Sequence, residues 1–214
     1  MTDLEFVLNW VNEIDYSALS RNKSLTWEYV LSHLDKPWDW SSLSANPCVT
    51  WETVLEHPEM HWDFFYLSQN ENITPEIIES HPERKWSFNR LSSNKSVNID
   101  FVLNHLDEDW DWCWLSSNPG ILISDVEDIP ELPWNYNGLS FNPNLTWEFV
   151  EENQDKPFNK MGISMNKCIT WEIVENHPDF PWEYTGLSAN PNLTMEIVKE
   201  HIHLPWNWAW LSGN

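Results

Sequence analysis

Apolar and polar positions recur along this chain at a fixed spacing of 24 residues, with no insertion between one copy and the next. A Leu-Ser pair, with Ile in place of Leu once, marks every copy, and an Asn follows two residues after each Ser. These pairs begin at Leu19, Leu43, Leu67, Leu91, Leu115, Leu139, Ile163, Leu187 and Leu211. Nine matches in each of two columns indicate tandem repeats, in which every copy is one structural unit.

Each repeat contains two positions that are typical of helix starts. The first is Thr26, a preferred N-cap residue, with Leu25 before it and Val30 four residues after it as a hydrophobic staple. The second is Asp39, which Trp38 precedes. Its column holds Asp15, Asp39, Asp63, Ser87, Asp111, Asn135, Asn159, Glu183 and Asn207, of which only Glu183 is not a preferred N-cap residue.

The second helix is expected to end near Asn46, because Asn can adopt the left-handed conformation after a helix and Pro47 cannot continue one. The pattern therefore predicts two helices of about two turns in each repeat. Helices this short are marginal alone, so their aromatic faces must be covered by neighbouring repeats. We predict an all-α fold, a right-handed α-solenoid of nine repeats, with residues 1–214 as a single repeat domain.

An alternative to this fold is a leucine-rich repeat. The run Leu-Ser-x-Asn-x-x-Leu is faintly similar to that motif, and Trp-Asp-Trp alternates like a short strand. The aliphatic spacing before the Asn does not fit leucine-rich repeats, and the two N-cap columns favour helices.

Both ends of the chain carry features of a repeat array. Asp3 stands in the first Trp column, and residues 4–10 are expected to form an amphipathic helix that caps the array. At the other end Trp208, Trp210 and Leu211 would lie near an uncovered face. We therefore expect a homodimer in which two C-terminal repeats pack around a two-fold axis. The alternative is a monomer whose Trp side chains fold back onto the preceding repeat.

The net charge of −23, from 34 acidic and 11 basic residues, disfavours binding to nucleic acid and to anionic membranes, whereas a basic protein partner is compatible with it. No apolar run approaches the roughly 18 residues that span a bilayer, and the N-terminus lacks a signal peptide. We expect an intracellular protein that is not secreted. The three cysteines are few and widely spaced, so free thiols are expected.

A column of histidines invites a metal-binding interpretation, but its spacing argues against one. Imidazoles in successive repeats would lie about 8–10 Å apart, too far to share a zinc ion. In His57-Pro58-Glu59-Met60-His61 the Glu is one place late for a zinc-protease motif, and His201 with His203 is a similarly weak pair. The column comprises His33, His57, His81, His105, His177 and His201, and it is interrupted by Ile129 and Asn153.

No arrangement of residues typical of an active site is present, and the gapless spacing leaves no loop for one. A column of Glu residues that includes Glu148 is explained by the helix dipole. We predict no catalytic, cofactor-binding or metal-binding residue, and therefore a protein that is not an enzyme. The Trp columns are expected in the core, with the repeated Ser and Asn accepting indole N–H groups or satisfying backbone groups in the turns.

The string Trp-Glu-x-Val-x-x-His-Pro-x-x-x-Trp-Asp-Trp-x-x-Leu-Ser-x-Asn-Pro-x-Leu-Thr resembles the tryptophan-rich tandem repeats of giant DNA viruses of amoebae, such as mimiviruses and marseilleviruses. The resemblance covers essentially the whole chain. It implies a viral origin, a repeat-protein role and a location in the host cytoplasm or the virion, and it transfers no catalytic residue. Residues 121–132 and 153–163 depart from the pattern; the second departure places Lys160 where other repeats have an aromatic residue.

The sequence thus predicts a protein-interaction scaffold whose binding face lies in its variable columns. One column includes Tyr66, Arg90, Trp114 and Trp210; with Trp208 and Leu211 these are the candidate partner-binding residues. A second variable column comprises Tyr29, Thr53, Ile77, Phe101, Asp125, Phe149, Ile173 and Ile197. The alternatives are a self-assembling component of a virion or viral factory, and an acidic nucleic-acid mimic that captures basic proteins.

Overall fold

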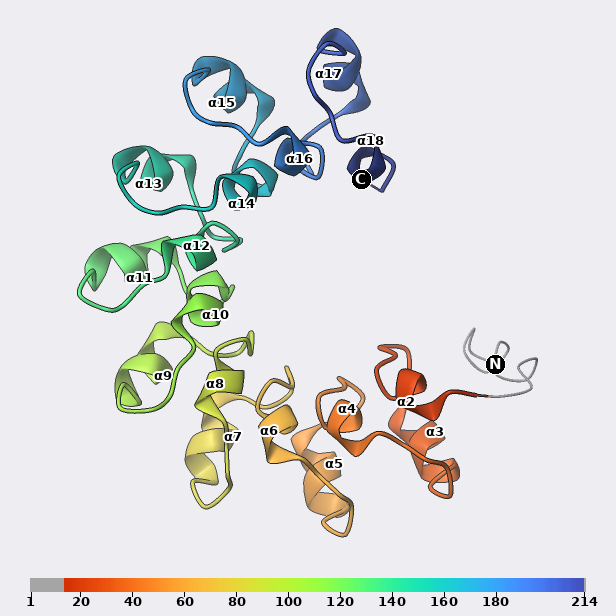
Figure 1. The fold of residues 1–214 in the computed structure, drawn as a ribbon. Helices are drawn as coiled ribbons and strands as arrows, with labels where there is room; N and C mark the ends of the chain where they lie inside the picture. Colours follow the sequence, from red (N-terminus) through yellow and green to blue (C-terminus); the bar gives the residue numbers. More distant parts are fainter. Residues whose placement is uncertain (1–13, 214) are drawn as a thin grey trace. The chain divides into compact units, whose positions relative to one another are not determined.

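A computed structural model describes residues 14–213 of the chain (Figure 1). Within this range the secondary structure is helical, with no strand, which confirms the all-α prediction. The chain divides into two compact units, Met1–Trp110 and Asp111–Asn214. The expected N-terminal cap at residues 3–10 lies outside the described residues, and the right-handed solenoid and the single repeat domain stay predictions.

In the first unit, four-residue or five-residue helices alternate with six-residue helices. These are α2 (Tyr16–Leu19), α3 (Trp27–Ser32), α4 (Trp40–Ser44), α5 (Trp51–Glu56), α6 (Phe64–Leu67), α7 (Pro75–Ser80), α8 (Phe88–Leu91) and α9 (Ile99–Asn104). Within this unit α2, α4, α6 and α8 lie in one row and α3, α5, α7 and α9 in another, called here the even row and the odd row (Figure 1).

The second unit has an even row and an odd row of its own, and its even helices have four or six residues (Figure 1). Its helices are α10 (Trp112–Ser117), α11 (Ile123–Asp128), α12 (Tyr136–Leu139), α13 (Trp147–Glu152), α14 (Lys160–Met165), α15 (Trp171–Asn176), α16 (Tyr184–Leu187), α17 (Met195–Glu200) and α18 (Trp208–Leu211). No helix among residues 14–213 is long and apolar enough to cross a membrane.

Both predicted N-cap columns cap helices. The Thr26 hydroxyl accepts the backbone N–H of Tyr29 at the start of α3, and the Asp39 carboxylate accepts two backbone N–H groups at the start of α4. Glu183 makes no such bond, as its side chain led us to expect. The helices are shorter than the predicted two turns, because the turn that follows each one begins after four to six residues.

The hydrophobic staples meet in a common core. In the first repeats, Leu25 and Val30 from one staple and Trp38 and Leu43 from the other belong to one buried cluster, together with Leu19. The Leu of the Leu-Ser pair is fully buried at Leu43. Each repeat therefore contributes apolar side chains from both of its helices to the core.

The repeated Asn joins each repeat to the one before it. The side-chain nitrogen of Asn142, which is fully buried, donates to the backbone oxygens of Ser116 at 2.9 Å, Asn118 at 3.1 Å and Ile121 at 3.1 Å. Its side-chain oxygen accepts the backbone N–H of Asn144 at 2.8 Å. One carboxamide thus satisfies a buried turn of the preceding repeat and holds its own turn in place.

The repeated Ser makes a second contact between neighbours. The buried Ser44 hydroxyl donates to the backbone oxygen of Trp40 at 2.8 Å and accepts the backbone N–H of Asp63 in the next repeat at 3.0 Å. Ser and Asn therefore satisfy backbone groups in the turns, which was one of the two roles expected for them.

The buried Trp residues find their acceptors elsewhere, so the expectation that Ser or Asn accepts their N–H groups was wrong. The Trp38 indole N–H donates to the backbone oxygen of His33 at 2.9 Å, five residues earlier, and Trp206 donates in the same way to His201 at 2.9 Å. The prediction that the repeated Asn adopts the left-handed backbone conformation was also wrong, since no residue among 14–213 has a positive φ. Asn118, for example, caps α10 with φ −70 and ψ 132, in an extended conformation.

We predict that Asn142→Ala lowers the free energy of unfolding by about 1–3 kcal/mol, because the substitution leaves buried carbonyl oxygens without donors. Glu148→Gln is the matched control and should cost less than about 1 kcal/mol, because Glu148 is exposed and contributes mainly through the helix dipole. Urea unfolding followed by circular dichroism measures both. Equal and negligible effects would contradict the structural role of the Asn.

Candidate interaction surface

The residue before each repeated Leu forms the first variable column, and its exposure differs from one repeat to the next. In the first unit Tyr66 and Arg90 are half-buried. In the second unit Trp114 is 60% exposed and Trp210 is 46% exposed. Both tryptophans belong to even-row helices, α10 and α18. The even row therefore presents different side chains from one repeat to the next.

In the first unit Arg90 lies against two aromatic rings of the preceding repeat. Its guanidinium carbon is 4.4 Å from the ring centroid of Phe65 and 5.5 Å from that of Tyr66. One of its terminal nitrogens is 3.4 Å from the side-chain oxygen of Gln69. These contacts join two of the predicted partner-binding residues, Tyr66 and Arg90, in one cluster.

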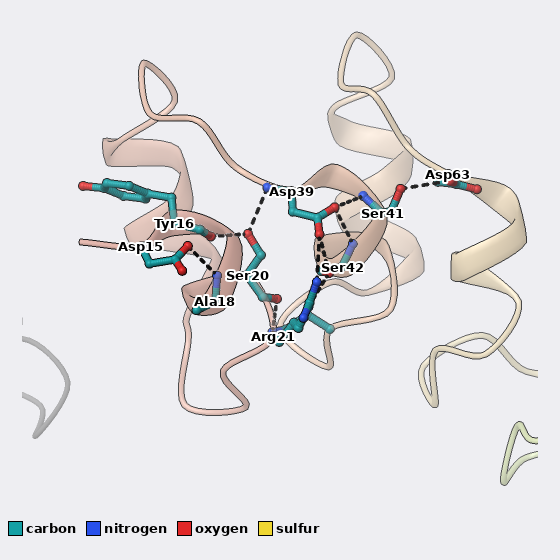
Figure 2. A network of polar contacts seen from close by, with 10 residues as sticks. Asp15, Tyr16, Ala18, Ser20, Arg21, Asp39, Ser41, Ser42 and Asp63 are labelled. Carbon is teal, nitrogen blue, oxygen red and sulfur yellow. Dashed lines mark hydrogen bonds and ion pairs between the residues drawn. The ribbon is translucent and has the colours of Figure 1, made fainter. Parts of the chain in front are cut away.

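A network of polar contacts covers the start of the same even row (Figure 2). Arg21 donates to the Ser42 hydroxyl at 3.2 Å and lies 3.7 Å from the Asp39 carboxylate. The Ser42 hydroxyl donates to Asp39 at 2.7 Å, and Ser41 donates to Asp63 of the next repeat at 3.1 Å. The bond from Ser42 and those from neighbouring backbone N–H groups lower the pKa of Asp39, so its carboxylate stays ionised at neutral pH.

In the second unit the even row is apolar near its last helix. Trp208 is 57% exposed, Trp210 is 46% exposed and Leu211 is half-buried. Trp210 lines a cavity of about 430 Å³ together with Met165, Ala189, Ala209 and Gly213. Both tryptophans are thus partly exposed, and the homodimer and the monomer with folded-back tryptophans both stay predictions.

The aromatic residue that begins most even helices packs on a ring of the following repeat. Trp112 packs edge-on against Trp134 at a centroid distance of 5.4 Å, and Tyr184 packs against Trp206 at 5.5 Å, in both cases 22 residues later. Among the described residues no ring packs on Trp208 in this way.

Glycine replaces larger side chains in the variable column at Gly138, Gly162 and Gly186, all of which are buried. A Cβ atom on Gly186 would lie 2.6 Å from the backbone oxygen of Met161 and 2.9 Å from the Cβ of Ser164. These three positions are therefore packing contacts between adjacent even-row helices. Trp114 lies outside this run of glycines and remains free for a partner.

Three members of the second variable column are buried in the core. Thr53 is 8% exposed, Phe101 is 3% exposed and Phe149 is 4% exposed, and the other members are half-buried. Their side chains vary because the odd helices pack against neighbours of different size. Phe149, for instance, packs edge-on against Phe158 at a centroid distance of 6.2 Å.

The histidines of the repeat column lie at the C-caps of the odd helices. Some also accept a hydrogen bond from a buried tryptophan of the preceding repeat. Trp51 donates to His81 Nε2 at 3.3 Å, and Trp147 donates to His177 Nε2 at 3.2 Å. The sequence carries a signal for this pairing, because every Trp of that column is followed by a His 30 residues later. Residues 14–213 contain no group of three His, Cys, Asp or Glu placed to hold a metal ion.

Lys160 makes a cation–aromatic contact in which the cation and the ring occupy each other's usual positions in the repeat. In the first unit the Arg84 guanidinium lies 5.3 Å from the ring centroid of Phe64, twenty residues earlier. In the second unit the Lys160 ammonium lies 4.7 Å from the ring centroid of Phe180, twenty residues later. The same cation–aromatic contact is kept with the two roles reversed, and burial lowers the pKa of Lys160. At the position of the missing His, the Asn153 side chain donates to the backbone oxygen of Phe149 at 2.9 Å. This bond links the end of α13 to the residue four places earlier.

No protein-family model, no curated protein and no solved structure matches the chain. The resemblance to repeats of giant viruses therefore stays a prediction.

We predict that Gly186→Ala destabilises the protein by about 1–3 kcal/mol, because the new methyl group meets backbone atoms that cannot move aside freely. An alanine would otherwise favour a helix by about 1 kcal/mol, so the sign of the change reports the close packing. Gly213→Ala is the control, since its Cβ would meet nothing nearer than 3.7 Å. Stabilisation by both substitutions in urea unfolding would rule out the close contact.

We also predict that one thiol reacts much faster than the other two. Burial raises the pKa of Cys48 to about 11 and that of Cys168 to about 12, so both remain protonated thiols at neutral pH, whereas Cys113 is exposed. Ellman's reagent at about pH 8 should release close to one equivalent rapidly, and Cys113→Ser should abolish that phase. A rapid phase that survives Cys113→Ser would show that a buried cysteine is accessible.

Proposed function

We propose that this chain is a non-enzymatic protein-interaction scaffold, a right-handed α-solenoid of nine repeats that presents the variable side chains of its even row to a protein partner. The observation that carries the proposal is the contrast between two kinds of position. The constant Ser is buried from Ser20 to Ser188 and the constant Asn from Asn46 to Asn190, whereas the variable column holds exposed Trp114 and Trp210. Side chains that vary and remain exposed on a regular framework are typical of repeat proteins that bind partners.

Tryptophan on such a surface supports recognition of protein in particular. Trp is enriched among the residues that dominate binding energy at protein interfaces, because its large ring buries much apolar area at little cost in side-chain entropy. Exposed Trp residues at 46–60% are far from the usual burial of this side chain. The resemblance in sequence adds the proposal that the protein is viral and acts in the host cytoplasm or the virion.

Capture experiments test the scaffold. Tagged protein is incubated with lysate of infected amoebae at about 0.1 M and about 1 M salt, a range over which the screening length falls from roughly 10 to 3 Å. A defined partner that is retained at high salt and lost with Trp114→Ala supports the proposal. Met195→Ala, which removes a 50% exposed apolar side chain from the odd row, is the matched control. Salt-sensitive capture of many basic proteins would favour the acidic-mimic alternative instead.

Self-association is the second candidate, and exposed Trp208 and Trp210 beside an apolar cavity favour it. We propose a two-fold homodimer through the last repeat, with Trp208, Trp210 and Leu211 in the interface. This arrangement would bury the uncovered Trp208 ring and keep the acidic odd helices of the two copies apart.

Light scattering distinguishes a dimer from a monomer. We expect the mass of a dimer at micromolar concentration, and we expect Trp210→Glu to give a monomer because it places a charge in an apolar interface. Ile202→Glu is the control, because Ile202 is 59% exposed but lies in the turn after α17, outside the even row. A wild-type monomer, or a dimer indifferent to Trp210→Glu, would refute the C-terminal interface.

A further inference from the structure

Charge is unevenly distributed over the first unit. Most of its acidic side chains belong to the odd helices and the turns that follow them, where only three basic residues accompany them. These acids are Glu28, Asp35, Glu52, Glu56, Glu59, Glu76, Glu79, Glu83, Asp100, Asp107, Glu108 and Asp109, and the basic residues are Lys36, Arg84 and Lys85. The even helices and their following turns carry four basic residues: Arg21, Lys23, Arg90 and Lys95.

The acids of this even row are already engaged in local contacts. Asp15, Asp39 and Asp63 are N-caps whose carboxylates accept backbone N–H groups. Glu71 lies 3.4 Å from Lys95. Among residues 14–110 the even row therefore carries as many basic as acidic residues, four of each, whereas the odd helices and their turns are strongly acidic.

A cavity of about 400 Å³ opens among these residues. Its lining includes two cations and one carboxylate, and the residues are Arg21, Lys23, Asp39, Ser41, Ser42, Ala45, Asn46, Pro47, Tyr66 and Gln69. The Arg21 side chain is 71% exposed, so its guanidinium is accessible to a ligand. We call this cavity, together with Arg90 behind its Tyr66–Gln69 wall, the cationic groove.

Arg90 extends this groove, and two aromatic rings orient its guanidinium. Its guanidinium lies on the Phe65 and Tyr66 rings, which fixes its plane. No carboxylate of residues 14–110 lies within ion-pair distance of it, and its single hydrogen-bond acceptor there is Gln69 at 3.4 Å. Its Nε atom is buried without an acceptor in that part of the chain. An arginine oriented by aromatic rings and lacking a carboxylate is suited to bind one from outside.

We propose that the cationic groove binds an acidic segment of a protein partner, whose Asp or Glu carboxylates pair with Arg21, Lys23 and Arg90. This deepens the proposed scaffold function and rests on it. The ligand chemistry follows from the donors: two guanidinium groups and an ammonium recognise carboxylates, and the Tyr66 ring and Ala45 provide apolar contact for the stems of the acidic side chains.

The overall charge of −23 does not prevent such binding. The screening length is about 8 Å at physiological ionic strength, so carboxylates on the odd helices act weakly on a ligand that lies farther away than this in the even row. The nearest acid, Asp39, is occupied by the Ser42 hydroxyl and by Arg21. Within the groove the three cations Arg21, Lys23 and Arg90 outnumber the one carboxylate, Asp39, and we expect this local balance to favour an acidic peptide.

Fluorescence anisotropy with labelled decapeptides tests the proposal on the full chain. The probes are oligoglutamate, oligolysine and a neutral Gly-Ser peptide, in salt at about 0.15 M. We expect saturable binding of oligoglutamate, weakened at least about fivefold by Arg90→Gln and by Arg21→Gln, since each removes a charge-assisted contact. Lys36→Gln, which removes a cation outside the groove, should change the affinity less than about twofold.

Arg90→Lys separates the role of the planar guanidinium from that of charge alone, because lysine keeps the charge but not the forked donors. We expect an intermediate affinity, with thermal unfolding unchanged in every variant. Oligoglutamate that does not bind, binding indifferent to Arg21 and Arg90, or tighter binding of oligolysine would overturn the proposal. Displacement of oligoglutamate by an equal concentration of oligothymidylate would also overturn it and indicate a phosphate site. If the groove proposal fails in this way, capture of a partner that depends on Trp114 would still support the scaffold function.

Discussion

Hydrogen bonding of buried backbone carbonyls is the constraint on which both units depend. Helices of four to six residues leave most of their carbonyl groups without an intrahelical partner, and packing the next repeat against them excludes water. The Asn side chain solves this problem at one point. Its amide nitrogen donates to the turn of the preceding repeat, as Asn142 does to Ser116, while its oxygen holds the turn of its own repeat. Asp would lack the donors, and Gln would place them too far from the backbone. The Asn recurs in every copy of the motif for this physical reason.

The constant Ser and the indole groups complete this arrangement. Ser44 links one helix to the N-cap of the next, and Trp38 bonds the carbonyl at the end of the helix before it. The chain thus uses side chains to satisfy backbone groups that longer helices would satisfy among themselves. Because these contacts occupy the interior, the even row is free to vary. That freedom is what allows Tyr66, Arg90 and Trp114 to differ at one position of the repeat.

Periodicity and capping chemistry were sufficient to predict the helices and their starts. Thr26 and Asp39 cap as their side chains indicate, and even Glu183 behaves as the exception that its chemistry predicts. The contacts of the buried side chains were harder to predict. The acceptor of the Trp38 N–H is a backbone group, which no pattern of side chains specifies. The buried glycines and the reversed Lys160–Phe180 pair depend on how closely neighbouring helices approach, and one sequence gives no measure of that distance. The same limit explains why Phe101 was expected on a surface and lies in the core.

The reach of these contacts has a consequence for how the protein is made. Asn142 bonds residues 21 to 26 places earlier, and the Trp147–His177 bond spans 30 residues, so partners within a unit lie close together in the chain. Low contact order favours rapid folding, since little loop entropy is lost before each contact forms. Each new repeat that leaves the ribosome finds its partner already exposed in the segment just before it. Folding can therefore keep pace with synthesis, and the aromatic faces of a growing chain need remain uncovered only for the time it takes to translate one more repeat.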